Sequence, residues 1–228
     1  MTVIINYDTS PDLSFKGIVP AIELIPDWYK KIPVYLEDDE KSLTVKRCMP
    51  FFDSLSLGYH MILAQDVYFV VNENEILFKS ELVPNSSDMA IFKRDKNLTG
   101  DMMSPKGYAK IDFTWLTQVS LGLPDGYSAL FTHPLNRFDL PFITLSGVID
   151  GEIELSNGNI PFYIEENFKG VIKKGTPIIQ IIPFKREDFS LEHKKGMYIS
   201  SKHEAMREKT EEESYPYRKK FRRRKIFK

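Results

Sequence analysis

Residues 123–184 read LPDGYSALFTHPLNRFDLPFITLSGVIDGEIELSNGNIPFYIEENFKGVIKKGTPIIQIIPF, and this stretch predicts the architecture of the chain. Short apolar runs are separated by proline, glycine and asparagine, and the polar residues fall between the runs rather than along one face of a helix. Such punctuation is typical of strands joined by tight turns. We therefore expect a mainly β fold, with the strands at 143–149, 171–172 and 178–182 forming its core.

The sequence before residue 123 predicts further strands and few helices. Four prolines between residues 11 and 33 exclude a long helix there and leave room for a single helical turn at 27–31. Residues 84–106 are polar, carry two prolines and a glycine, and predict a long loop. Alternation and flanking turn residues predict strands at 3–5, 43–47, 59–63, 67–71, 75–79 and 108–113.

The length and composition of the chain favour one main domain. The 228 residues, 42% of them hydrophobic, are enough for a single domain with a sizeable core. We expect one β-rich domain over residues 1–186, beginning with the proline-rich segment. Residues 187–228 predict a C-terminal helix and a basic tail. Ser201 and Glu204 have the spacing of a capping box, so a charged helix is expected at 202–213.

The number of cysteines, the spacing of histidines and the length of apolar runs argue against disulfides, metal sites and membrane helices. Cys48 is the only cysteine, so no internal disulfide can form. No apolar run approaches the roughly 20 residues of a membrane helix, and we expect an intracellular protein that does not enter a membrane. His60, His133, His193 and His203 lack the H-x-D and H-E-x-x-H spacings of metal centres, so no metal site is expected.

The basic residues are concentrated at the C-terminus. Residues 218–228 hold eight of the 31 basic residues and no acidic one, which leaves 23 basic residues against 32 acidic ones in the rest of the chain. Such an arm can solubilise the chain, dock on an acidic protein surface, including that of another copy, or contact nucleic acid. Phe221, Ile226 and Phe227 favour docking, because a purely electrostatic arm needs no apolar groups. The residues expected to contact a partner or nucleic acid are Arg218, Lys219, Lys220, Arg222, Arg223, Arg224 and Lys225.

Three segments of residues 123–184 resemble the dUTPase and dCTP deaminase superfamily, whose members share a β-clip fold. LPDGYSALFTHPLNR is similar to the superfamily's Pro-x-Gly-Tyr strand and the phosphate-binding motif after it, although Leu135 and Asn136 intervene before Arg137. GVIDGEIELSN resembles its Gly-x-Ile-Asp hairpin, and FKGVIKKGTPIIQIIPF resembles its glutamine-containing strand, with Gln180 in the matching place. The resemblance implies a single β-clip-like domain, or a related β-sandwich or barrel. The superfamily's glycine-rich C-terminal arm has no counterpart, because the tail here is basic.

The same resemblance implies a nucleotide site formed by Asp150, Arg137 and Gln180. Asp150 would orient a water and accept its proton, while Arg137 and Gln180 would contact phosphate, and Mg²⁺ would arrive with the nucleotide. Apart from that Mg²⁺, no cofactor is expected. A structural interpretation competes, because Asp-Gly is a strong hairpin pair and Asp150 with Gly151 can simply make a tight turn. We favour the turn over catalysis.

A second resemblance covers more of the chain and supplies no activity. TVKRCMPFFDSLSLGYHM, LFTHPLNRFDLPFITLSG and GVIKKGTPIIQIIPFKRE are similar to an uncharacterised β-rich family of T4-like marine bacteriophages and some bacteria. It implies a phage setting, in the host cytoplasm or the virion. We therefore expect a non-enzymatic binding or structural protein, an accessory or virion component. The alternative is a dUTPase-like nucleotide-binding protein or nucleoside triphosphate hydrolase. Because β-clip relatives often form trimers, self-assembly is also implied.

Overall fold

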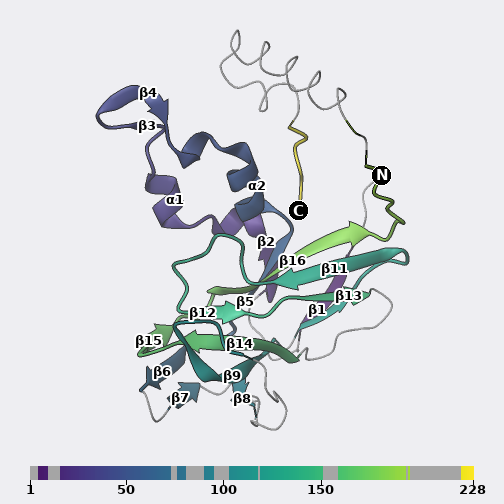
Figure 1. Cartoon of the computed structure of the whole chain (residues 1–228). Coiled ribbons are helices and arrows are strands. Elements are labelled where there is room, and N and C mark those ends of the chain that lie inside the picture. The colour runs from purple at the N-terminus through teal and green to yellow at the C-terminus, as the bar shows by residue number, and fades with distance from the viewer. Residues whose placement is uncertain are drawn as a thin grey trace.

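The chain folds into stacked antiparallel sheets with few helices, as the sequence predicts (Figure 1). The computed structural model describes residues 5–9, 16–72, 76–80, 90–94, 103–117, 119–150, 159–193, 195 and 222–228. The predicted helix at 202–213 lies outside the described residues, as does most of the turn expected after Asp150. The division into domains at residue 186 stays a prediction; the last strand, β16, ends at Lys185.

A five-stranded sheet carries most of the residues singled out in the sequence. Its strand order is β13-β11-β16-β5-β2. All of its pairs are antiparallel, and in their register Thr132 lies opposite Gln180, which lies opposite His60. The strands are β13 (Gly147–Asp150), β11 (Tyr127–Thr132), β16 (Pro177–Lys185), β5 (Tyr59–Ile62) and β2 (Ile18–Pro20).

Two further sheets lie below the five-stranded sheet in Figure 1. One has the order β12-β14-β9-β8 and the other the order β15-β6-β7. The first is built from β12 (Phe142–Thr144), β14 (Asn159–Glu165), β9 (Tyr108–Leu116) and β8 (Ile91–Lys93). The second is built from β15 (Lys169–Ile172), β6 (Val67–Val71) and β7 (Ile76–Ser80). Strand β8 lies within the segment 84–106, so the prediction of one continuous loop there is wrong.

The core between the sheets is rich in aromatic rings. Trp115 stacks on Phe162 with ring centroids 3.6 Å apart, and Phe142 meets Trp115 edge-on at 5.0 Å. All three side chains are buried, and each contributes roughly 1.5–3 kcal/mol to stability through the apolar surface it removes from water. The Trp115 indole N–H donates to Thr144 Oγ1 at 3.0 Å, and that hydroxyl donates to the Ile178 carbonyl at 2.7 Å. These bonds tie the four-stranded sheet to β16.

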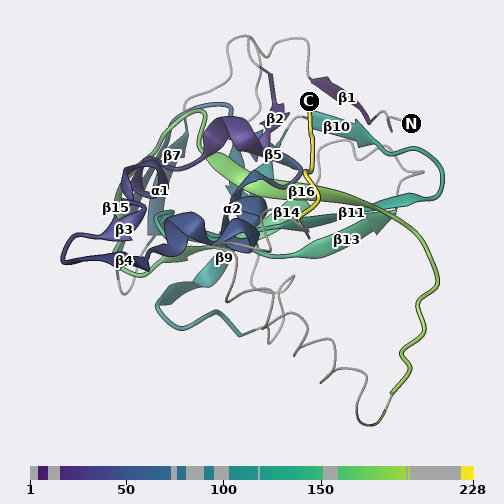
Figure 2. The same ribbon diagram turned by 90° about the horizontal axis from the view of Figure 1, so that it is seen from above.

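The helices lie together at one end of the five-stranded sheet (Figure 2). The predicted turn at 27–31 is helix α1 (Asp27–Lys31), and a 3-10 helix, η1 (Ala21–Leu24), precedes it. The predicted strand at 43–47 is wrong. Strand β4 ends at Leu43, and the Thr44 hydroxyl accepts from the Lys46 N–H to begin a 3-10 helix, η2 (Val45–Arg47). Helix α2 (Met49–Ser56) follows and was not predicted.

Two two-stranded antiparallel sheets complete the described structure. Strand β1 (Asn6–Thr9) pairs with β10 (Val119–Gly122), and β3 (Tyr35–Leu36) pairs with β4 (Asp39–Leu43). Gly17 approaches Val119 so closely that a Cβ at this glycine would overlap the valine side chain, so the backbone before β2 is pressed against β10. No helix in the described part of the chain is both long enough and apolar enough to cross a bilayer.

Candidate functional site

Gln180, predicted to contact phosphate, is a buried structural link. Its side chain is fully buried, and both amide hydrogens are used, donating to the carbonyls of Ser54 at 3.0 Å and Leu57 at 2.6 Å. Its carbonyl oxygen accepts from the Leu135 N–H at 2.7 Å. Gln180 therefore joins the end of α2 to the loop after β11, and one oxygen lone pair remains for any further bond.

Arg137, the second predicted phosphate contact, is engaged by a neighbouring carboxylate. Its Nε donates to Asp139 Oδ1 at 2.8 Å and its Nη2 to Asp139 Oδ2 at 2.9 Å, a two-point pair. The Trp28 indole N–H also donates to Asp139, at 3.1 Å. Burial would raise the pKa of Asp139, but the Arg137 and Trp28 contacts outweigh it and the pKa is lowered. The loop is braced further by Asn136, whose amide donates to Ser54 Oγ at 2.6 Å.

Asp150, the predicted base, lies at the exposed end of β13. Its carboxylate accepts a hydrogen bond of 2.7 Å from the hydroxyl of Ser128, the residue opposite it on β11. Gln180 faces Thr132, four residues further along β11 and on the opposite side of that strand from Asp150. At about 3.3 Å per residue, the offset along the strands alone is roughly 13 Å. Asp150 and Gln180 thus lie apart in one sheet, and Arg137 lies in the loop after β11. Each of the three is bonded to other residues of the chain. Their nucleotide roles stay predictions.

Two histidines lie beside Gln180 and Arg137, His60 buried and His133 half-buried. His133 Nε2 lies 3.2 Å from the Arg137 carbonyl and its Nδ1 lies 3.4 Å from the Thr144 N–H, which assigns the neutral ring with hydrogen on Nε2. Burial lowers its pKa. Burial also lowers the pKa of His60, to about 4, and His60 Nδ1 has no hydrogen-bond partner. Among the described residues, no three histidine, cysteine, aspartate or glutamate side chains gather as a metal centre would require.

The end of the basic tail, residues 222–228, is docked on helix α2, and we call this segment the arm. Arg222 grips Asp53 with Nη2 at 2.6 Å from Oδ1 and Nε at 3.2 Å from Oδ2, and Lys225 Nζ lies 3.0 Å from Oδ2. Asp53 is only 8% exposed. The Arg222 hydrogen bond lowers the pKa of Asp53, burial opposes it, and Lys225 adds to the lowering. Of the predicted contact residues, Arg223 and Arg224 are exposed, and Arg218, Lys219 and Lys220 lie outside the described residues.

Aromatic contacts accompany these ion pairs. The Arg222 guanidinium lies over the Phe52 ring, 5.9 Å from its centroid, and the Phe227 ring meets Tyr59 edge-on at 5.5 Å. The arm therefore crosses from α2 to β5, where Figure 1 shows it in yellow. We call Phe52, Asp53 and Tyr59 the receptor site. Sequence reasoning missed it, although Asp53 is the only charge in the apolar stretch MPFFDSLSLGY.

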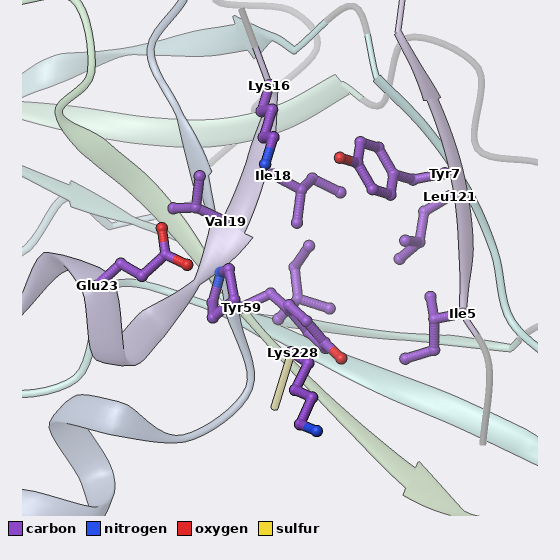
Figure 3. Close-up of a pocket in the computed structure, with 11 residues that line it drawn as sticks. Ile5, Tyr7, Lys16, Ile18, Val19, Glu23, Tyr59, Leu121 and Lys228 are labelled. Carbon is purple, nitrogen blue, oxygen red and sulfur yellow. The ribbon is translucent and has the colours of Figure 1, made fainter. Parts of the chain in front are cut away.

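A pocket of about 200 Å³ lies where the arm ends (Figure 3). Its walls come from β1, β2, β5 and β10, and the side chain of Lys228 lines it. Lys16 and Tyr7 point into the pocket from opposite sides, and Ile5 and Leu121 line the side near β1. No signal in the sequence brings these segments together, because β1 pairs with a strand more than 100 residues away.

No family model and no curated protein sequence matches the chain. Among solved structures, a dUTPase mutant of Staphylococcus bacteriophage 80alpha with dUpNHpp is 14% identical with a TM-score of 0.35, and the match covers 86% of this chain and 91% of that one. A dUTPase mutant of phage phi11 of S. aureus is 18% identical with a TM-score of 0.25, covering 42% of this chain and 77% of that one. Both belong to the superfamily that residues 123–184 resemble. Likeness at this level assigns neither activity nor partner to the chain, and the second resemblance, to the uncharacterised phage family, stays a prediction.

Proposed function

We propose that this chain is a non-enzymatic binding or structural protein of a bacteriophage, an accessory or virion component whose basic arm docks at the receptor site. The observation that carries the proposal is that Arg222 and Lys225 both donate hydrogen bonds to the Asp53 carboxylate. One acidic side chain on α2 binds two cations from a segment 169 and 172 residues away in sequence. The phage setting comes from the sequence resemblance.

The receptor site combines charge with apolar contact. Charge-assisted, two-point hydrogen bonds are the strongest class of polar contact and fix the orientation of the arm. Because the Asp53 carboxylate is largely covered, salt screens it less than it screens an exposed pair. Phe227 adds an aromatic edge contact with Tyr59, worth about 0.5–1.5 kcal/mol beyond its buried area. A basic segment without an aromatic residue is expected to bind this site more weakly.

A second copy of the chain is the partner that we propose. Each copy carries both an arm and a receptor site, so the contact made within one chain can equally form between two, as in domain swapping. The negative charge of the rest of the chain attracts the arm from a distance. Nucleic acid would compete for the same arm, because Arg222 and Lys225 cannot grip Asp53 and a phosphate with the same hydrogen bonds.

Phe138 offers a second point of attachment to a partner. It is 84% exposed, yet its neighbours Arg137 and Asp139 form a two-point ion pair and Asn136 is bonded to Ser54. An aromatic side chain presented on a braced loop loses little conformational freedom when it binds, which favours its use at an interface. We expect Phe138→Ser to weaken partner capture and to leave folding unchanged.

Charge reversal tests the proposal. Asp53→Arg and Arg222→Asp should each abolish assembly when measured alone by size exclusion with light scattering. Mixing the two variants gives two complementary pairs between copies, one native and one reversed, and should restore assembly, which only docking between copies can do. The exposed pair Asp66–Lys173, reversed in the same way, is the control. Unchanged assembly in both single variants would contradict the proposal, and loss of DNA retention without loss of assembly would assign the arm to nucleic acid.

The alternative function is dUTPase-like nucleotide binding or hydrolysis. The observation that favours it is the exposed Asp150 carboxylate, which water can reach and which Ser128 orients. Incubation with a panel of deoxynucleoside triphosphates and Mg²⁺ tests it. Turnover that Asp150→Asn abolishes would establish the alternative, and neither turnover nor binding would remove it.

A further inference from the structure

The pocket at the end of the arm has one apolar side. Ile18, Leu121 and Ile181 are all buried. Together with Ile5 and the Tyr59 ring they form a hydrocarbon surface. Figure 3 shows Ile5, Leu121 and the Tyr59 ring converging at the end of the pocket away from Lys16. An apolar group placed there leaves water without needing a polar partner.

The opposite end of the pocket is polar and cationic. The Lys16 ammonium and the Tyr7 hydroxyl point toward each other across Ile18 in Figure 3. Among the described residues, no hydrogen bond or ion pair holds either group. The Glu23 carboxylate lies on the far side of Val19 from Tyr7, and the ammonium of Lys228 points away from the pocket. One cation and one phenolic donor therefore face the space between them.

The volume limits what can enter. About 200 Å³ is below the range of pockets that hold drug-sized ligands, roughly 300–1,000 Å³. With about 30 Å³ for each water in the liquid, the pocket has room for roughly seven groups of that size. A chain of five or six carbons with one small head group fits this limit, whereas a nucleotide does not.

We propose that this pocket binds a small amphipathic carboxylate, with its hydrocarbon chain against Ile5, Leu121 and Ile181 and its carboxylate between Lys16 and Tyr7. A monoanion suits one ammonium and one hydroxyl, which provide charge-assisted hydrogen bonds to two carboxylate oxygens. The ligand also contacts the aliphatic part of Lys228, the last residue of the arm. Occupancy of the pocket and docking of the arm therefore stabilise each other, since linkage is reciprocal. The inference does not rest on the proposed function, because every lining residue except Lys228 lies outside the arm.

Calorimetric titration of the full chain with hexanoate tests the proposal. Hexanol carries the same chain without charge, and hexylammonium carries the opposite charge. We expect hexanoate to bind at least tenfold more tightly than either. Lys16→Met keeps the length of the side chain and removes its charge, so it should weaken hexanoate at least tenfold and leave hexanol unchanged. Lys110→Met, at an exposed lysine of β9, is the matched control and should change neither.

Three results would overturn the proposal. The first is that hexanoate does not bind at millimolar concentration, and the second is that hexanoate and hexylammonium bind with equal affinity. The third is that Lys16→Met leaves the affinity for hexanoate unchanged. Arg222→Asp separates this site from the receptor site. It releases the arm, so hexanoate should still bind with reduced affinity, and unchanged affinity would contradict only the linkage to the arm.

Discussion

At the scale of single residues, polar side chains buried in the five-stranded sheet hold the loops in place. Gln180 shows this most clearly, because its side-chain amide makes hydrogen bonds to three backbone groups from two separate segments. The hydrogen-bond partners at Ser54 and Leu57 are 126 and 123 residues away in sequence. A glutamine in this position is therefore a structural residue first, whatever ligand approaches the loop.

Gln180→Leu should destabilise the fold strongly. The substitution removes the side-chain partner of the Leu135 N–H and of two carbonyls in a part-buried site. Each such group costs about 1–3 kcal/mol when it is left unsatisfied. We expect the free energy of unfolding in urea to fall by about 3 kcal/mol or more. Gln65→Leu is the control, because Gln65 is also buried but makes one side-chain hydrogen bond among the described residues, donated to Ser80 Oγ at 2.7 Å. Equal losses in the two variants would contradict the structural role of Gln180.

His60 should make stability depend on pH. Its pKa is about 4 in the folded state against about 6.5 when unfolded, mainly because burial disfavours the charged ring. Between these values the unfolded chain binds the proton and the folded chain does not, so stability is complete above pH 6.5 and falls toward pH 4. The loss amounts to about 3 kcal/mol at most. His133 contributes in the same direction, since burial lowers its pKa too.

Urea unfolding at pH 7 and at pH 5 checks this. His60→Gln should reduce the difference in unfolding free energy between the two pH values, and His193→Gln, at an exposed histidine, should not. A difference that His60→Gln leaves unchanged would show that His60 does not titrate as its burial implies.

The resemblance to the dUTPase superfamily singled out Gln180, Arg137 and Asp150, and the sequence could not identify their hydrogen-bond partners. A buried glutamine that binds a ligand and one that binds distant backbone leave the same local pattern. For Gln180, two of the three partners lie at the end of α2, a helix that local propensity does not reveal. The same limit applies to Asp53, whose cations lie at the other end of the chain.

At the scale of elements, the connection between α2 and β5 depends on one glycine. Gly58 has φ +71, and a Cβ there would overlap the Ile181 carbonyl oxygen. The glycine thus meets both requirements at once, a left-handed backbone and a close approach of two chains. This allows the α2 terminus to contact β16, where Gln180 binds it.

Gly58→Ala should therefore reduce the stability of the fold far more than the same change at Gly126. Gly126 has φ +78 but nothing within 4 Å of its Cβ position, so only the backbone conformation opposes alanine. We expect a loss of about 1 kcal/mol for Gly126→Ala and several times that for Gly58→Ala. Thermal unfolding of both variants checks the contrast. Equal melting temperatures would mean that the approach to Ile181 is not as close as described.

Strands were more predictable than helices in this chain. Alternation and turn residues placed β5 and β6 within one residue of their observed bounds. In β6 every second residue is buried, which leaves a period of two in the sequence. Helix α2 has eight residues, too few turns for a clear helical period, and begins with a proline at its first turn. The segment 43–47 is apolar enough for a strand, but the Thr44 cap overrides that pattern.

At the scale of the whole molecule, the account depends on the arm occupying the receptor site. Charge segregation in the sequence predicts that the arm binds an acidic surface. Composition alone does not identify the carboxylate that it binds. In the structure the meeting point lies between α2 and β5, next to the pocket that Lys228 lines. Docking of the arm therefore places it close to β1, and residues of both line the same pocket (Figure 2).

The most direct measurement is zero-length carbodiimide coupling of the unmodified protein, followed by mass spectrometry of the peptides. Lys225 Nζ and Asp53 lie 3.0 Å apart and should couple, as should the exposed pair Lys173 and Asp66 at 2.8 Å, which serves as the internal control. Mixing light and isotopically heavy copies shows whether the Asp53–Lys225 link forms within a chain or between chains. The account predicts this link in high yield and its loss in Arg222→Asp. Coupling of Lys173 to Asp66 without any Asp53–Lys225 product would contradict it.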